Sequence, residues 1–220
     1  MNTSRHTDTV DYRTAMGKLL VLYTQVDDLI MRACAERIAT APDEPARLAL
    51  AKQVGDESRH VAIQRAWMEK FCTTATPVLS STKESAILDH FRKLDWLDFL
   101  TDMYLCVEAL GSDAVEKIVP LADPGTRESL HIPLQDELDH IDFGISRLQQ
   151  ELAKMPSEKR KEFLARIPGR IESLYRVFQK MNPNIREMFE AVGADYDEIR
   201  RSVLKRREEV IEETGRPLAA

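Results

Sequence analysis

The sequence predicts an all-helical protein built around a four-helix bundle. Glycine is scarce, with 8 residues among 220, while the helix-favouring residues Ala, Leu, Glu, Arg and Lys are plentiful. Apolar residues recur every three or four positions over several long segments, which is the period of one helix face. The sequence contains no alternating Val/Ile/Thr run and no Asn-Gly turn that would indicate a strand or a hairpin.

The first two long helices are expected over residues 12–40 and 45–73. Segment 41–45 contains two prolines and ends the first helix. A proline-containing turn over 74–81 and a short helix over 82–92 follow, and this connection suits a crossover better than a hairpin. The apolar positions that define the first helix are Met16, Leu20, Tyr23, Ile30 and Cys34.

The other two long helices are expected over residues 95–119 and 126–154. Between them, Asp123-Pro124-Gly125 is a strong stop signal. Pro133 lies inside the last segment, where a proline removes a backbone hydrogen bond, so we expect a kink or a restart there. Four long helices in this order predict an antiparallel bundle of two helix pairs.

The chain is expected to form one bundle domain, over residues 10–155, with a helical extension over 156–217. The extension is richer in charge and contains helical runs near 157–180 and 195–213, which Pro183 divides. We expect these helices to pack on the outside of the bundle and not to form a second domain.

Composition argues against several classes of function. The net charge is −6 and the pI is near 5.5, whereas a nucleic-acid-binding protein is usually basic; the same argument weakens a membrane-surface role. Cys34, Cys72 and Cys106 are widely spaced, which argues against a disulfide scaffold or a zinc ribbon. No apolar leader or membrane-length run is visible, and a cytoplasmic location is expected.

Two copies of the pattern Asp-Glu-x-x-His point to a metal site. They are Asp56-Glu57-Ser58-Arg59-His60 in the second long helix and Asp136-Glu137-Leu138-Asp139-His140 in the fourth. A three-residue spacing places the Glu and the His on one face of a helix, about one turn apart. Two such pairs are half of a di-metal site in a helical bundle, and the other two helices usually supply one carboxylate each.

The remaining two helices offer carboxylates at matching offsets. Glu108 lies in an apolar stretch, where an unpaired carboxylate is costly to bury, and it precedes Glu137 by 29 residues. Asp27 continues the inward stripe of the first helix and precedes Glu57 by 30 residues. Its neighbour Asp28 is rotated off that stripe and is the weaker candidate.

These residues predict a site for two divalent cations. The expected ligands are Asp27, Glu57, His60, Glu108, Glu137 and His140. Four carboxylates balance the charge of two such cations, and oxygen and imidazole ligands suit iron or manganese. Asp56 and Asp136 are expected to hold the metal-binding histidines by hydrogen bonds, with Asp136 on His60 and Asp56 on His140.

The motif Asp-Glu-x-Arg-His at 56–60 resembles the ferritin-like diiron-carboxylate proteins over residues 12–154. The stretch 136–144 is similar to the fourth-helix motif of phenylacetyl-CoA-epoxidase-type subunits, in the oxygenase branch that also holds the bacterial multicomponent monooxygenase hydroxylases. Two residues depart from the pattern: Asp27 stands where most such families have Glu, and Asp139 where the motif has Arg. Ribonucleotide-reductase small subunits also use Asp at the first of these positions.

The resemblance implies an oxygen-activating non-haem diiron oxidase or oxygenase, which hydroxylates, epoxidises or desaturates a small organic substrate. It implies two iron ions, with a manganese–iron pair as the alternative, dioxygen as co-substrate, and Ser112 as a candidate proton donor. Gln64 replaces the Tyr expected in radical-forming relatives, and Gly111 the extra Glu of rubrerythrin-type peroxide reductases. The long C-terminal extension fits storage ferritins poorly.

A separate reductase is the expected partner, because the sequence shows no flavin, haem or iron–sulfur motif. The long helices are compatible with a homodimer, and the oligomeric state stays open. The alternative function is a non-catalytic metal-binding or storage protein, or a structural subunit of an oxygenase complex. A cavity of substrate size beside the metals would favour the enzyme.

Overall fold

The computed structural model describes residues 9–71, 76–181 and 184–216, and every regular element in these ranges is helical. In chain order the elements are α1 (Val10–Ile38), α2 (Glu44–Phe71), α3 (Ser81–Lys93), α4 (Trp96–Leu100), η2 (Thr101–Glu108), α5 (Ala109–Ile118), η3 (Val119–Leu121), α6 (Pro124–Ala153), α7 (Ser157–Met181), α8 (Ile185–Ala191) and α9 (Tyr196–Gly215). In the described part of the chain no helix is long and apolar enough to cross a membrane.

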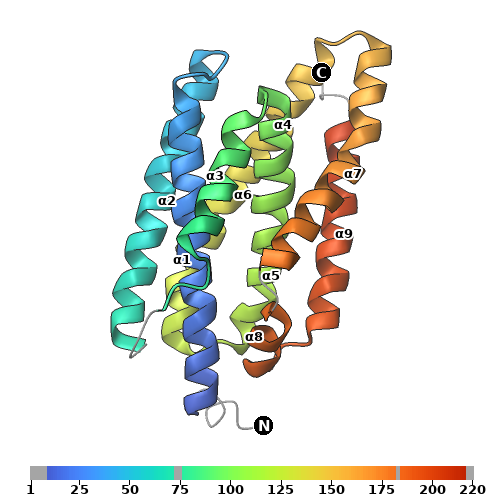
Figure 1. Cartoon of the computed structure of the whole chain (residues 1–220). Coiled ribbons are helices and arrows are strands. Elements are labelled where there is room, and N and C mark those ends of the chain that lie inside the picture. Colours follow the sequence, from blue (N-terminus) through green and yellow to red (C-terminus); the bar gives the residue numbers. More distant parts are fainter. Residues whose placement is uncertain (1–8, 72–75, 182–183, 217–220) are drawn as a thin grey trace.

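Helix α1, helix α2, the α4–η2–α5 segment and helix α6 form the bundle (Figure 1). Helix α1 packs along α2, α2 packs against α6, and α6 packs against η2 and α5. A continuous core of buried apolar side chains, which includes Met16, Leu20, Met103 and Leu148, fills the interior. The predicted helices therefore exist with bounds that differ by a few residues, and α3 lies within the predicted crossover.

The starts of α1 and α6 are fixed by side-chain caps. Thr9 accepts a hydrogen bond from the backbone N–H of Tyr12, and Asp123 accepts one from Thr126. The Tyr12 hydroxyl donates to the Asp123 carboxylate (3.1 Å) and accepts from the Asp123 N–H (2.8 Å). Within the predicted Asp-Pro-Gly stop signal, Asp123 is therefore the N-cap of α6. Pro124 occupies the first turn, where a missing backbone N–H costs no helical hydrogen bond.

The structure describes the surroundings of Pro133 and of His90. Helix α6 continues through Pro133 without a restart. The Nε2 of His90 in α3 lies 2.7 Å from the buried carboxylate of Asp102. Arg170 of α7 donates two hydrogen bonds to the same carboxylate, so Asp102 joins α3, η2 and α7.

The third bundle helix contains a π-helical segment that the sequence did not reveal. In η2 the hydrogen bonds close wider turns, as from the N–H of Ala109 to the carbonyl of Tyr104, five residues back. Such segments are rare, short and frequent at functional sites. Glu108 is the last residue of η2, so this unusual geometry sets the direction of its carboxylate.

The C-terminal helices cover one side of the bundle. Helix α9 packs on α5 and α6, α7 on η2, and the short α8 on α1 (Figure 1). The predicted run 157–180 corresponds to α7 and the run 195–213 to α9, whereas α8 was not predicted. The expected break at Pro183 falls outside the described residues.

Candidate metal centre

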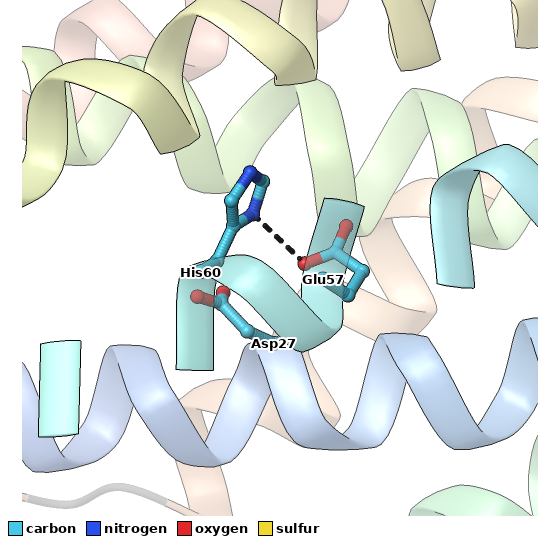
Figure 2. Close-up of side chains that lie close together, drawn as sticks. All are labelled: Asp27, Glu57 and His60. Atoms are coloured by element: carbon cyan, nitrogen blue, oxygen red, sulfur yellow. Dashed lines mark hydrogen bonds and ion pairs between the residues drawn. The ribbon is translucent and has the colours of Figure 1, made fainter. Parts of the chain in front are cut away.

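A first group of potential ligands joins α1 and α2. Asp27, Glu57 and His60 are buried, and one ligand atom of each lies within 4.8 Å of the others. Figure 2 shows the Asp27 carboxylate rising from α1 toward His60 and Glu57, and the Nδ1 of His60 lies 3.2 Å from Glu57 Oε2. Asp28 points elsewhere, because its partly exposed carboxylate pairs with Arg32 at 3.4 Å.

A second group lies beside the first and shares Glu57 with it. Glu57, Glu108 and His140 also place ligand atoms within 4.8 Å of one another. The Nδ1 of His140 is 3.4 Å from Glu57 Oε1 and 3.8 Å from Glu108 Oε1. Glu57 Oε2 faces His60 and Glu57 Oε1 faces His140, so this carboxylate lies between the two groups.

Glu137 lies near these groups but belongs to neither. Its Oε2 is buried without a hydrogen-bond partner, and its pKa is raised by burial and by the nearby charges of Glu108 and Asp27. The Ser112 side chain, which hydrogen-bonds the carbonyl of Glu108 at 2.8 Å, also opposes this rise in the pKa of Glu137. Ser112 therefore lies beside the Glu137 carboxyl and the backbone of Glu108, and the structure assigns it no proton transfer.

Each motif holds the histidine of the other. Asp136 Oδ2 is 2.9 Å from His60 Nε2, and Asp56 Oδ2 is 3.3 Å from His140 Nε2. Such contacts fix the ring orientation and leave Nδ1 of each histidine facing the carboxylates. Arg59 donates to both aspartates, at 3.2 Å to Asp56 and 2.5 Å to Asp136.

The two aspartates remain ionised although each is largely buried. Burial acts to raise the pKa of Asp56, but hydrogen bonds from Lys52 and His140 outweigh it and hold that pKa below its usual value. Burial also acts to raise the pKa of Asp136, but hydrogen bonds with His60 and Arg59 outweigh it and hold that pKa below its usual value. Each carboxylate can therefore accept a hydrogen bond from the Nε2–H of a histidine.

Two glutamines of α2 donate hydrogen bonds to the carboxylates of Asp27 and Glu108. The sequence did not assign them this role. Gln64 donates to Asp27 Oδ2 at 2.7 Å and accepts from the Thr24 hydroxyl at 2.7 Å. Gln53 donates to Glu108, and its carbonyl accepts a 2.7 Å hydrogen bond from the Tyr104 hydroxyl. Spacing could have found them, because Gln53 lies four residues before Glu57 and Gln64 four after His60, on the inward face.

The buried carboxylates are poorly satisfied without a cation. Burial, followed by the charge of Glu108, raises the pKa of Asp27 to about 8. The same two causes, with further nearby acids, raise the pKa of Glu57 well above its usual value. Glu57 Oε1, Glu108 Oε2 and His140 Nδ1 are buried without hydrogen-bond partners. Buried oxygen and nitrogen atoms that point toward one another and receive no hydrogen bond are suited to binding a cation. Carboxylate oxygen and imidazole nitrogen are ligands that suit iron or manganese.

An apolar cavity of about 250 Å³ adjoins the centre. Its lining comes mainly from α1, η2, α5 and α6, together with residues of α7, α8 and α9 that include the solvent-exposed Arg200. Asp27, Glu108 and Glu137 line the inner end, while residues such as Val26, Ile30, Leu110 and Leu134 line its walls. Sequence alone could not reveal this space, because it is formed by side chains from elements far apart in the chain.

Two solved structures share this arrangement of helices. A protein with aldehyde deformylating oxidase activity from Synechococcus superposes with a TM-score of 0.77, covers 94% of this chain and 93% of its own, and is 18% identical. A variant of an R2-like ligand-binding oxidase with an anaerobically reconstituted Mn/Fe cofactor gives a TM-score of 0.66 at 13% identity, over 93% of this chain and 82% of its own.

No family model and no curated protein matches the sequence. The predicted ferritin-like helical bundle with added C-terminal helices is confirmed. The narrower resemblance to the oxygenase branch stays a prediction.

Proposed function

We propose that the protein is an oxygen-activating non-haem oxidase or oxygenase that holds two metal ions and acts on a small organic substrate. The observation that carries the proposal is the pair of buried ligand groups that share Glu57, beside an apolar cavity lined by Asp27 and Glu108. Iron is the metal we expect, with a manganese–iron pair as the alternative. Metal ions at this site would supply the binding and reduction of dioxygen.

The residues around the site have separate tasks in this proposal. The proposed ligands are Asp27, Glu57, His60, Glu108, Glu137 and His140. Asp56 and Asp136 orient the histidines, and Gln53 and Gln64 orient Glu108 and Asp27. The apolar walls keep water from the reacting end of the substrate. Ser112, at the boundary between cavity and carboxylates, is the proposed proton donor.

The reactions we propose are hydroxylation, epoxidation or desaturation. Insertion of one oxygen atom, with release of the other as water, consumes two electrons and two protons in addition to the substrate. The described residues include no cysteine cluster that could store these electrons, since Cys34 and Cys106 are both buried and unpaired. A separate reductase is therefore the proposed electron donor.

The cavity favours catalysis over a storage or scaffolding role. A protein that only stores iron has no need for an apolar chamber against its carboxylates, and small-molecule sites are mostly apolar with a few polar groups at one end. Both structural neighbours are described as oxidases, and one carries a Mn/Fe cofactor, which also supports the proposal.

Oxygen uptake by the iron-loaded protein tests this function. Protein loaded anaerobically with ferrous iron should retain about two irons per chain and, on exposure to oxygen, oxidise both irons, as followed by an oxygen electrode and Mössbauer spectroscopy. Glu57→Gln should abolish this uptake because Glu57 serves both groups. Glu69→Gln is the matched control, since Glu69 is an exposed residue of the same helix.

Two results would contradict the proposal. One is a folded protein, by circular dichroism, that retains no iron. The other is uptake of many irons per chain with continued oxygen consumption, which would indicate storage.

A further inference from the structure

The outer end of the cavity differs chemically from its inner end. Asp27 and Glu108, which are buried, and Glu137 supply carboxylates to its lining and mark the inner end, whereas Arg200 of α9 lines the same cavity, is solvent-exposed and marks the outer end. Among the described residues that line the cavity, Arg200 is the one cationic side chain. The space between them is bordered mainly by apolar side chains, so the cavity has an acidic end, an apolar body and a basic end.

No hydrogen bond or ion pair joins Arg200 to an acidic side chain of the described chain, although its charge acts on Asp197 from a distance. Asp197, one turn earlier on α9, is engaged by Arg186, with contacts of 2.8 and 3.3 Å. Glu172 of α7 is engaged by Arg207 at 2.9 Å and by Arg176 at 2.8 Å. The Arg200 guanidinium is solvent-exposed and keeps its donors available for a ligand.

We propose that the substrate is an elongated apolar carboxylate whose charged group pairs with Arg200, so that its opposite end lies against Asp27, Glu108 and Glu137. The proposal rests on the oxidase function given above and adds the substrate class and its direction. Arginine binds carboxylates in a bidentate manner, and Arg200 is the cationic side chain among the described residues that line the cavity. The apolar body would be held by burial against the cavity walls.

Relaxation of ligand protons by a paramagnetic ion tests the direction of binding. The probe is octanoate, added in excess to protein loaded with Mn(II), with proton relaxation measured by NMR. Because the effect falls steeply with distance from the ion, the terminal methyl protons should relax fastest and the protons beside the carboxylate slowest. The reverse order would mean that the carboxylate lies at the metal and would overturn the proposal.

Calorimetry on the metal-free protein tests the role of Arg200 separately. Arg200→Gln should weaken octanoate binding by roughly 3- to 10-fold, the range for one partly exposed charged contact, and leave 1-octanol binding within about twofold. Arg201→Gln removes the same charge from the neighbouring position, which does not line the cavity, and should leave both affinities unchanged.

These experiments separate the two proposals. Undetectable octanoate binding, or an equal loss in the Arg200 and Arg201 variants, would overturn the assignment of the anionic group. Failure to bind Mn(II) would instead contradict the metal centre, and the calorimetric comparison would still decide the role of Arg200.

Discussion

Gln64 connects a predicted ligand to the rest of the protein, and its removal has a specific expected effect. Gln64→Leu deletes the donor to Asp27 while keeping a side chain of similar size. Loss of a group that orients a ligand typically costs about 10- to 100-fold in metal affinity, so we expect that loss at one of the two metal positions. Titration with Mn(II), followed by electron paramagnetic resonance, measures it.

The matched control is Gln149→Leu. Gln149 donates to the carbonyl of Glu213 on α9, away from the metal centre, so its replacement should leave the Mn(II) titration unchanged. Equal titration curves for the Gln64 variant and the wild type would show that Gln64 does not position Asp27.

At the residue scale, the sequence identified the proposed metal ligands better than the uncharged side chains that hydrogen-bond them. Asp27, Glu57, Glu108 and His140 stood out because buried charge is rare and their spacing repeats. Gln53, Gln64 and Tyr104 did not stand out, since uncharged polar or aromatic side chains at helical spacing are common in cores. Spacing places Gln53 and Gln64 on the inward face, but their roles depend on which side chain faces them across the bundle, which spacing within one helix does not contain.

At the scale of elements, Gly144 sets the distance between α6 and η2. A Cβ atom at Gly144 would overlap Cβ and Cγ of Tyr104, whose ring also packs edge-on against Phe143 with centroids 5.5 Å apart. Gly144→Ala should therefore force these elements apart and lower the free energy of unfolding by about 1–3 kcal/mol, as overpacking does. Chemical denaturation measures the change.

Gly169→Ala is the control for this prediction. Gly169 lies inside α7, and a Cβ atom there would meet open space. Alanine should stabilise the helix by roughly 0.5–1 kcal/mol, since it loses less conformational entropy than glycine on folding. A Gly144 variant that is as stable as the wild type would show that η2 adjusts to the added atom without cost.

Periodicity predicted the long helices well and the irregular segments poorly. Helices α1, α2, α6, α7 and α9 follow a regular apolar pattern, and their existence was confirmed. The π-helical η2 was missed because it is only eight residues long, with seven of them buried, and its apolar pattern does not differ from that of an α-helix. The restart that was one of two expectations at Pro133 does not occur, since α6 continues through this residue although it lacks one backbone hydrogen bond there.

At the scale of the whole molecule, the C-terminal helices complete the chamber that the bundle begins. Side chains of α7, α8 and α9 contribute to its lining, and Arg170 of α7 joins the extension to Asp102 of η2. The extension therefore belongs to the proposed substrate site. The sequence predicted helices there but not this role, because their inner faces are defined only by the bundle they cover.

The number of metal ions that each chain binds tests the central claim most directly. Fe(II) content, measured after anaerobic loading and gel filtration, should be about two per chain in the wild type. His60→Ala and His140→Ala should each reduce it to about one, because each histidine belongs to a different ligand group. Wild-type protein that is folded but binds no iron, or histidine variants that keep both ions, would contradict a centre built from these two groups.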